Sequence, residues 1–305
     1  MRLSDFFPTE QVLRDREFTA LGLSNSNGPD GMLSFLEDPR YASELLENPR
    51  IRAVLCTDSA AGQLPESMGA VVCQSPRRAY FTLHNRLAQS PDYCPPQAPS
   101  VIPASCRVSP LAYIAPTGVV LGERVTVEEF VSIHGPCQIG DGCVLHPGVK
   151  LGGAGYEFKY SGDEVLDVAH CGGVELGENV VLWENVTVHR AVYPWDRTVI
   201  GANSRIGAQS HIDHGAKIGR CVKVCAGCVV SGRTVVGAHA LLGPGSVCSN
   251  RITVGDHARV LLGSVVTKDV PAGMAVSGNF AIGHADHIAQ MKQSAGLKTS
   301  KGELS

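Results

Sequence analysis

Two histidines and an aspartate in the segment SHIDHG (210–215) are the residues of this chain best suited to proton chemistry. A further histidine lies upstream in the pair His189-Arg190. Histidine exchanges protons near neutral pH and can serve as a general base. A surface histidine is more often simply solvated, so a catalytic role for His211 or His214 needs independent support. The spacing of the chain provides that support for His214.

Aliphatic residues recur at every sixth position along most of the sequence. One run extends from Leu121 to Leu151 and a second from Leu176 to Val260, with Pro194 and Cys248 as departures. This period fits neither a helix nor an ordinary strand and is typical of a hexapeptide β-helix. We therefore predict a mainly β fold, a left-handed parallel β-helix over residues 105–280. Glycine often follows the inward aliphatic residue, and we expect it to form the corner at positive φ.

Three six-residue sides make one coil, so residues 18 apart should stack on neighbouring coils. Gly232 follows His214 by that interval. Its backbone amide is thus expected one coil along, at roughly the 4.8 Å spacing of adjacent strands. A base beside a free N–H is the arrangement that acyl transfer requires, because the base removes a proton and the N–H stabilises the oxyanion. His214 and Gly232 are therefore our candidate catalytic residues.

The remainder of the chain lacks the six-residue period. Residues 1–90 predict a small α/β domain, with strands at MLSFLE, IRAVLCT and GAVVCQ. Two helices are expected after Asp38-Pro39 and Ser75-Pro76, where each pair supplies an N-cap and a first-turn proline. Residues 91–104 form a Pro-rich linker, and 281–305 a short C-terminal helix and tail. Within the β-helix, residues 155–170 and 191–198 are predicted to leave the coil as loops, where binding sites are often built.

Composition excludes several classes of protein. The 305 residues carry a net charge of −3 without a basic run, so nucleic acid is not an expected partner. No apolar stretch is long enough to cross a membrane, and the N-terminus does not resemble a signal peptide. Eleven cysteines, an odd number, favour a reducing cytoplasmic location. Cys221, Cys225 and Cys228 have a cluster-like spacing, but we expect them at corner and outward positions of a coil.

The chain resembles the UDP-3-O-acylglucosamine N-acyltransferases of lipid A biosynthesis over about residues 10–280. Phe35 and Tyr41 flank Asp38-Pro39 in LSFLEDPRYASELLENPR, which is similar to the family's uridine-binding stretch. SHIDHGAKIG is similar to the segment that carries the family's catalytic histidine, which places that role on His214. AGYEFKYSGDEV resembles an aromatic loop between coils. The resemblance implies that Phe35 and Tyr41 stack on uracil, with Asp38 between them.

Three segments depart from the family pattern. His189-Arg190-Ala191 replaces an Asp-Arg-Gly segment and is closer to the related O-acyltransferase of the same pathway. Ser249-Asn250-Arg251 stands where the family has a second histidine. Residues 265–279 resemble the end of acetyl-CoA-dependent hexapeptide acetyltransferases. We include His189, Arg190, His211 and Arg251 as candidate substrate-binding residues.

The sequence thus predicts an enzyme that transfers an acyl group from a thioester to the amine of a UDP-amino sugar, with His214 as general base. By resemblance the donor is a 3-hydroxyacyl-acyl carrier protein. We expect a cytoplasmic homotrimer, because the outward apolar sides of three β-helices must be covered and the site needs two walls. One alternative keeps the sugar but uses acetyl-CoA or another short acyl-CoA. Another is a non-catalytic paralogue that only binds a nucleotide sugar.

No bound cofactor is expected for this reaction. His189, His211 and His214 could instead hold zinc, as histidines do in the β-helical carbonic anhydrases. Those proteins have a longer gap between their last two ligands than the interval between His211 and His214. We therefore expect no metal at these residues.

Overall fold

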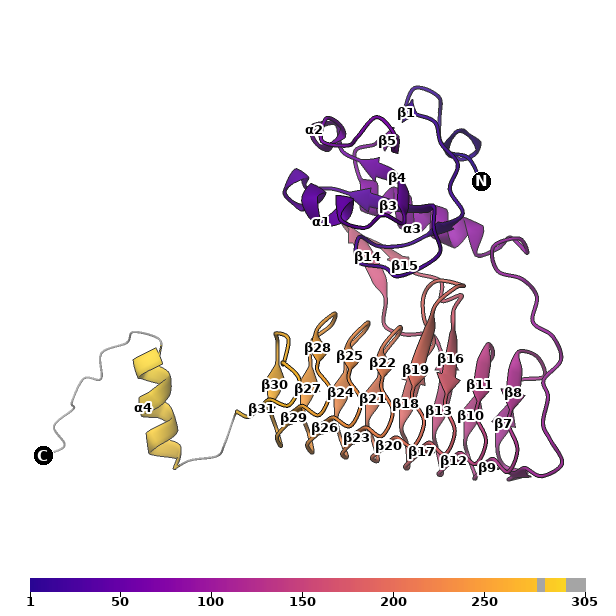
Figure 1. The fold of residues 1–305 in the computed structure, drawn as a ribbon, viewed down its shortest axis with the longest axis vertical. Helices are drawn as coiled ribbons and strands as arrows, with labels where there is room; N and C mark the ends of the chain where they lie inside the picture. The colour runs from indigo at the N-terminus through magenta and orange to yellow at the C-terminus, as the bar shows by residue number, and fades with distance from the viewer. Residues whose placement is uncertain (279–282, 295–305) are drawn as a thin grey trace, which may run out of the picture.

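The computed structural model describes residues 1–278 and 283–294, and these form a small mixed α/β domain, a long parallel β-helix and a short helix (Figure 1). The predicted C-terminal tail, 295–305, lies outside the described residues, as do residues 279–282. Among the residues described, no helix is both long and apolar enough to span a membrane. The fold class predicted from the six-residue period is confirmed.

The N-terminal domain is built on a five-stranded sheet in the order β1-β5-β4-β3-β2. Its strands are β1 (Val12–Arg14), β2 (Ala20–Leu21), β3 (Met32–Leu36), β4 (Ile51–Cys56) and β5 (Gly69–Val72). Its helices are the 3₁₀ helices η1 (Leu3–Asp5) and η2 (Pro39–Tyr41), and α1 (Ala42–Leu46), α2 (Asp58–Ala61) and α3 (Pro76–Leu87). The pairs β2–β3, β3–β4 and β4–β5 are parallel, and β1 pairs antiparallel with β5. The three strands predicted from sequence correspond to β3, β4 and β5.

Both helix starts predicted in this domain lie where the sequence places them. Asp38 is the N-cap of η2, and its carboxylate accepts a hydrogen bond from the backbone N–H of Arg40. Ser75 is the N-cap of α3 with Pro76 next, as predicted, although its side chain makes no capping hydrogen bond. The position alone, with proline in the first turn, is sufficient to start α3.

Three parallel sheets form the sides of the β-helix. The first contains β7 (Tyr113–Ile114), β10 (Ser132–Ile133), β13 (Lys150–Gly153), β18 (Thr187–His189), β21 (His211–Ile212), β24 (Val229–Val230), β27 (Val247–Cys248) and β30 (Val265–Val266). The second contains β8 (Val119–Leu121), β11 (Cys137–Ile139), β16 (Gly173–Leu176), β19 (Arg197–Ile200), β22 (Lys217–Ile218), β25 (Val235–Val236) and β28 (Thr253–Val254). The third contains β6 (Arg107–Val108), β9 (Thr126–Val127), β12 (Val144–Leu145), β17 (Val181–Leu182), β20 (Arg205–Ile206), β23 (Lys223–Val224), β26 (Leu241–Leu242), β29 (Arg259–Val260) and β31 (Ala275–Val276). Beyond the coils, α4 (His284–Ser294) is the predicted C-terminal helix.

The inward aliphatic residues form one continuous buried core along the coils. In the regular part, stacked partners lie 18 residues apart, as Ile200 with Ile218 and Ile212 with Val230. The interval is longer where segments leave the coil: Leu151 pairs with Val188, and Leu176 with Ile200. The segment 191–198 thus inserts a whole hexad, which is why the aliphatic phase continues past it.

The glycine after each inward residue does not have the backbone conformation that we predicted. Apart from Gly152, these glycines lack a positive φ. The positive-φ corner lies three residues after the inward position instead, and is often not glycine: Arg124, Phe130, Asn179, Asn185, Asn203, Gln209, Cys221, Arg233, His239, Arg251 and His257. The glycine is required for another reason, because a Cβ on Gly177 or Gly201 would lie 2.6 Å from a backbone nitrogen of the next coil. Close stacking of coils therefore selects glycine at this position.

The cysteine prediction needs one correction. Cys221 takes a positive-φ corner and Cys225 is half-buried, but Cys228 is fully buried within the β-helix core. Burial in apolar surroundings suits a thiol, which behaves there as a small hydrophobic group. The eleven cysteines are all free thiols.

The two excursions from the coil connect the β-helix to the N-terminal domain (Figure 1). The predicted loop at 155–170 contains an antiparallel hairpin of β14 (Phe158–Ser161) and β15 (Glu164–Asp167). Asn85 of α3 donates a hydrogen bond to the Asp167 carbonyl at 2.7 Å. From the second excursion, Trp195 donates its indole N–H to the Leu21 carbonyl at 2.9 Å. The linker also contacts the first coils, through β-bridges from Pro99 and Val101. The domain boundaries assigned from sequence stay a prediction.

Candidate active site

A cleft of about 1020 Å³ lies between the N-terminal domain, the 155–170 hairpin and the edge of the β-helix. Six of the residues singled out in the sequence line it: Phe35, Asp38, Tyr41, His214, Gly232 and Arg251. This cleft lies within one chain. The nucleotide-binding candidates and the catalytic candidates thus share one cavity.

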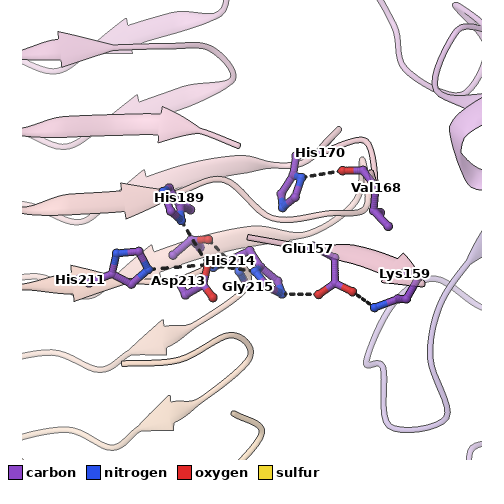
Figure 2. A network of polar contacts seen from close by, with 10 residues as sticks. Glu157, Lys159, Val168, His170, His189, His211, Asp213, His214 and Gly215 are labelled. Atoms are coloured by element: carbon purple, nitrogen blue, oxygen red, sulfur yellow. Dashed lines mark hydrogen bonds and ion pairs between the residues drawn. The ribbon is translucent and has the colours of Figure 1, made fainter. Parts of the chain in front are cut away.

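His214 is held by its neighbour Asp213 at a corner of the coil (Figure 2). The Asp213 Oδ1 atom accepts a hydrogen bond from the His214 backbone N–H at 2.7 Å and lies 3.0 Å from His214 Nδ1. This contact places the Nδ1 proton toward the carboxylate and leaves Nε2 to face the cleft. Gly215 N–H donates to Thr198 Oγ1 at 2.8 Å and fixes the backbone beside the histidine. The orienting carboxylate and the base are the two parts that a proton-transfer site needs.

Glu157 lies opposite Asp213, on the Nε2 side of the imidazole. Its Oε2 atom is 3.4 Å from His214 Nε2, and its other carboxylate oxygen pairs with Lys159. Figure 2 shows this row of residues, from Asp213 through His214 and Glu157 to Lys159. Glu157 was not predicted from the sequence, because it lies in the segment without periodicity. Asp213 was likewise given no role from the sequence.

These contacts set the protonation states of the group. Burial lowers the pKa of His214, but its hydrogen bonds to Asp213 and Glu157 outweigh that effect and raise the pKa to about 9. Burial raises the pKa of Glu157, but the bonds from His214 and Lys159 dominate and lower it to about 2. Burial also acts to raise the pKa of Asp213, but its bonds with His189 and His214 lower it well below the usual range. His214 is therefore an imidazolium between two carboxylates at neutral pH, and it must lose a proton before it can act as a base.

His170 is a second histidine of the site that the sequence analysis missed. Its Nδ1 lies 3.0 Å from the Val168 carbonyl, and its ring meets that of His214 edge-on, with centroids 5.6 Å apart. Burial is the largest cause that lowers its pKa to about 4, with the charge of His214 second. His170 is therefore neutral, and its buried Nε2 has no hydrogen-bond partner among the described residues.

Two glycines allow the backbone to approach these histidines closely. A Cβ on Gly232 would lie 2.7 Å from His214 Nε2. One on Gly155 would lie 2.9 Å from Asp213 Oδ1 and 3.1 Å from His214 Nδ1. The Gly232 N–H donates to no group in the described part of the chain. The neighbourhood predicted from the 18-residue interval is thus present, and any side chain at position 232 would displace the imidazole.

His189 and His211 approach Asp213 from the side away from the cleft. His189 Nδ1 lies 3.2 Å from Asp213 Oδ1, and His211 Nε2 lies 3.9 Å from the same oxygen. One ligand atom from each of the three residues lies within 4.8 Å of the others, a spacing that a metal ion could use. This set contains Asp213 in place of the His214 named in the sequence alternative. Neither His189 nor His211 lines the cleft, so their substrate-binding roles stay predictions.

The two remaining arginines of the sequence prediction differ in position. Arg190 donates from Nη1 to the Gly135 carbonyl at 3.0 Å, and it does not line the cleft. Arg251 lines the cleft from a corner of the coil, beside Gly232, whose carbonyl accepts its backbone N–H at 3.1 Å. A further arginine, Arg233, was not predicted: its Nη2 donates to Ser26 Oγ at 3.0 Å, and its buried Nη1 has no partner among the residues described.

The aromatic candidates lie at the end of the cleft formed by the N-terminal domain. Phe35 packs against Tyr80 and Phe81, and the Arg77 guanidinium lies 5.7 Å from its ring centroid. Tyr41 is 58% exposed, so its ring is free to contact a ligand. The Asp38 side chain is engaged by Arg40, which makes it a capping and ion-pairing residue in this structure.

Comparison with known proteins gives a class for this architecture. A bacterial transferase hexapeptide model of six repeats matches residues 118–153 and 197–232. Both matched stretches lie within the β-helix, so the hexapeptide repeat that the model describes is present there. It is 42% identical over 158 residues to UDP-3-O-acylglucosamine N-acyltransferase 1 of Gloeobacter violaceus, a match that covers 52% of this chain and 44% of the relative. The resemblance to the N-acyltransferases stated from motifs is thus confirmed.

Other relatives carry out O-acyl transfer. The acyl-[acyl-carrier-protein]–UDP-N-acetylglucosamine O-acyltransferase of Thermodesulfovibrio yellowstonii is 35% identical over 105 residues, covering 34% of this chain and 38% of the relative. The crystal structure of a Francisella novicida UDP-N-acetylglucosamine acyltransferase aligns with a TM-score of 0.48 and 22% identity, covering 66% of this chain and 73% of the other. The chain spans less than two thirds of the length of the first curated relatives that it matches.

Proposed function

We propose that this protein is an N-acyltransferase that joins the acyl group of a thioester to the amine of a UDP-amino sugar. One observation carries the proposal: His214, oriented by Asp213 and beside Gly232, lines the same cleft as Phe35 and Tyr41. A single cavity can therefore hold a nucleotide at one end and a reacting group at the other. The curated N-acyltransferase relatives supply the sugar and the reaction class.

The chemistry follows from the position of His214. The amine nitrogen forms a bond to the thioester carbonyl carbon as the C–S bond breaks. One N–H proton passes to His214 Nε2 and then to the departing thiolate, so the products are an amide and a thiol. An acceptor that binds as an ammonium ion also releases one proton to solvent. The Gly232 N–H, which has no partner among the described residues, supplies a hydrogen bond to the oxyanion.

The nucleotide end of the cleft uses aromatic and cationic groups. Phe35 and Tyr41 stack on the uracil, and Arg233 and Arg251 place positive charge between that end and His214. The Nη1 of Arg233, unpartnered within the described chain, suits a diphosphate oxygen, because guanidinium groups form strong charge-assisted hydrogen bonds with phosphate. These arginines do not act on the reacting bond.

We assign the donor to an acyl-acyl carrier protein, as the names of the O-acyltransferase relatives state for those proteins. The competing donor is acetyl-CoA or another short acyl-CoA, which is favoured by the sequence of residues 265–279. A homotrimer, a cytoplasmic location and a role in lipid A biosynthesis belong to the same proposal. No bound cofactor is required by the steps above.

A donor comparison tests the proposal. Purified protein receives UDP-3-O-acylglucosamine with 3-hydroxyacyl-acyl carrier protein in one reaction and with acetyl-CoA in another, and product mass is measured. We expect amide formation with the carrier-protein donor. Amide formation with acetyl-CoA alone would support the alternative donor. If UDP-sugar binds but neither donor gives product, and His214→Ala binds it equally well, the protein is a non-catalytic binding protein and the proposal fails.

A further inference from the structure

Glu157 is a charged residue of the cleft to which the mechanism above gives no task. It immediately precedes β14, and its backbone carbonyl accepts the Val168 N–H at 3.0 Å, which closes the base of the hairpin. Its side chain is 20% exposed and borders the cleft. The carboxylate is therefore fixed on a supported segment and reaches the site from outside the repeat.

The hairpin itself is held by the N-terminal domain, so the Glu157 position does not depend on the coil alone. Lys159 pairs with Glu157 and also lies 4.7 Å from the Phe81 ring centroid. Phe81 in turn contacts Phe35, with ring centroids 6.1 Å apart. A row of contacts thus connects the proposed uracil-binding ring with the carboxylate beside His214.

The location of Glu157 relative to the two imidazole nitrogens limits what it can do. Asp213 already engages Nδ1, so a second carboxylate is not needed to orient the ring. Glu157 instead faces Nε2 at 3.4 Å, and Nε2 is the nitrogen that must exchange a proton with the acceptor. The reacting atom of the acceptor must therefore come within hydrogen-bonding reach of both Nε2 and the Glu157 carboxylate.

Amines and hydroxyls differ in the hydrogen bonds that they can form with His214 Nε2 and the Glu157 carboxylate. A primary ammonium has three N–H donors and a positive charge, so it can donate to Glu157 and to His214 together. It can also replace the imidazolium as the partner of Glu157. A hydroxyl has one proton, and once that proton points to Nε2, its lone pairs face a carboxylate. A carboxylate oxygen next to an oxygen lone pair is unfavourable, because neither atom can donate a hydrogen bond to the other, so the carboxylate opposes hydroxyl acceptors.

We propose that Glu157 is the specificity-determining residue that selects an amine over a hydroxyl as the acceptor of acyl transfer. This inference rests on the proposed function. The choice between amine and hydroxyl matters for this chain because its relatives include both N- and O-acyltransferases. In this proposal, the choice between the two acceptors is made by a side chain at the base of the hairpin and not by a residue of the six-residue repeat.

The test uses two acceptors that differ only at the reacting atom, UDP-3-O-acylglucosamine and UDP-3-O-acylglucose. For wild type and Glu157→Gln, kcat/KM is measured with each acceptor and with the donor that gives product in the donor comparison. Calorimetry gives Kd for both acceptors without a donor. We expect Glu157→Gln to lower kcat/KM and affinity for the amine by about 10- to 100-fold, the range for a hydrogen bond to a charged group, and to leave the hydroxyl values within about threefold. Glu157→Asp should recover part of the amine preference.

Glu164→Gln is the matched control, since Glu164 lies in the same hairpin, is exposed and pairs with Arg78 away from the cleft. It should preserve the amine-to-hydroxyl ratio. The inference is overturned if the wild type accepts both acceptors equally, or if Glu157→Gln lowers the values for both to the same extent. Because the ratio is taken within one preparation, partial misfolding does not change it. The calorimetric binding measurements distinguish this inference from the proposed function. If the protein binds the amine selectively, this selectivity depends on Glu157 and no donor gives turnover, the inference holds and the proposed enzymatic function fails.

Discussion

The regular coils from Ile200 to Val260 and the interrupted coils between Leu151 and Ile200 perform different tasks. In the regular part each inward residue stacks on the next at an 18-residue interval, and the sides of the coil vary little. Where the repeat is interrupted, the hairpin places Glu157 in the cleft. The second excursion adds Tyr193 to the cleft lining and bonds Trp195 to the N-terminal domain. The regular repeat therefore fixes the backbone that carries His214 and Gly232, while the segments that interrupt the repeat form the sides of the cleft around these two residues.

Contacts between the excursions and the N-terminal domain support this division. Tyr193 and Trp195 stack with their planes 3° apart, and Tyr80 donates its hydroxyl to the Tyr193 hydroxyl at 2.9 Å. A β-helix without these segments would present His214 and Gly232 on an open surface. With them, the same two residues lie in an enclosed cleft, where electrostatic interactions are stronger than in water.

The largest effect should come from the base on the regular coils. His214→Ala removes the proton acceptor and is expected to lower kcat by about 10²- to 10⁴-fold, the usual contribution of general base catalysis. UDP binding should change little. His239→Ala is the control, because His239 also occupies a corner of a regular coil and stacks on His257, outside the cleft. Equal loss in both variants would contradict the assignment of His214.

Substitutions at two glycines should distinguish an effect on catalysis from an effect on the stacking of the coils. Gly232→Ala keeps the backbone N–H but places a Cβ 2.7 Å from His214 Nε2, so it should displace the imidazole and reduce kcat by about 10²-fold, with a small change in stability. Gly207→Ala places a Cβ 2.6 Å from the Ala226 backbone nitrogen of the next coil. It should instead lower the free energy of unfolding by about 1–3 kcal/mol, the range for overpacking. Activity assays and chemical denaturation of both variants measure this contrast, which would disappear if Gly232 served only to stack coils.

The pH dependence of stability should report the carboxylates around His214. The pKa of His214 is raised to about 9 in the folded protein, above its ordinary value of 6.5. The stability that it contributes is therefore complete below pH 6.5 and is lost as the pH rises to about 9, by an amount on the order of 1–3 kcal/mol. Denaturation of wild type and His214→Ala across this range gives the difference. If both curves have the same slope, the imidazolium is not held by Asp213 and Glu157.

The same residues predict a pH profile for activity. Because His214 must be neutral to accept a proton, kcat/KM of the wild type should rise with pH toward about 9. Glu157→Gln removes one of the two interactions that raise this pKa, so the midpoint should move to lower pH. Initial rates with saturating donor measure the shift. An unchanged midpoint would show that Glu157 does not interact with His214 in solution.

The smallest effect concerns the attachment of the excursion to the N-terminal domain. Trp195→Phe keeps most of the ring but removes the hydrogen bond to the Leu21 carbonyl. It should cost about 0.5–1.5 kcal/mol of stability and weaken UDP binding slightly, with kcat unchanged. Denaturation and calorimetric titration with UDP measure these effects. A large fall in kcat would show that the interrupted coil also acts on the base.

Sequence alone predicted the elements whose cause is periodic or local. The six-residue period predicted the β-helix, because each buried position repeats with the side of the coil. Asp38 and the strands around it followed from local capping and propensity. The interval from His214 to Gly232 predicted a spatial neighbourhood, since stacking at 18 residues is a property of the regular coil itself. The corner conformation was mispredicted, because both tight corners and close stacking select glycine and only the backbone angles tell them apart.

Tertiary structure decided the contacts between the coils and the segments that lack the six-residue period. Glu157 and His170 reach His214 through a hairpin whose course is set by contacts with α3, and Arg233 reaches the cleft at a non-glycine corner. His189, Arg190 and His211 are near His214 in sequence, yet they do not line the cleft, because neighbouring side chains on a coil point in different directions. A repeating sequence determines its own stacking. Only the packing of the domain and the excursions against the coils decided which outward residues share a cavity.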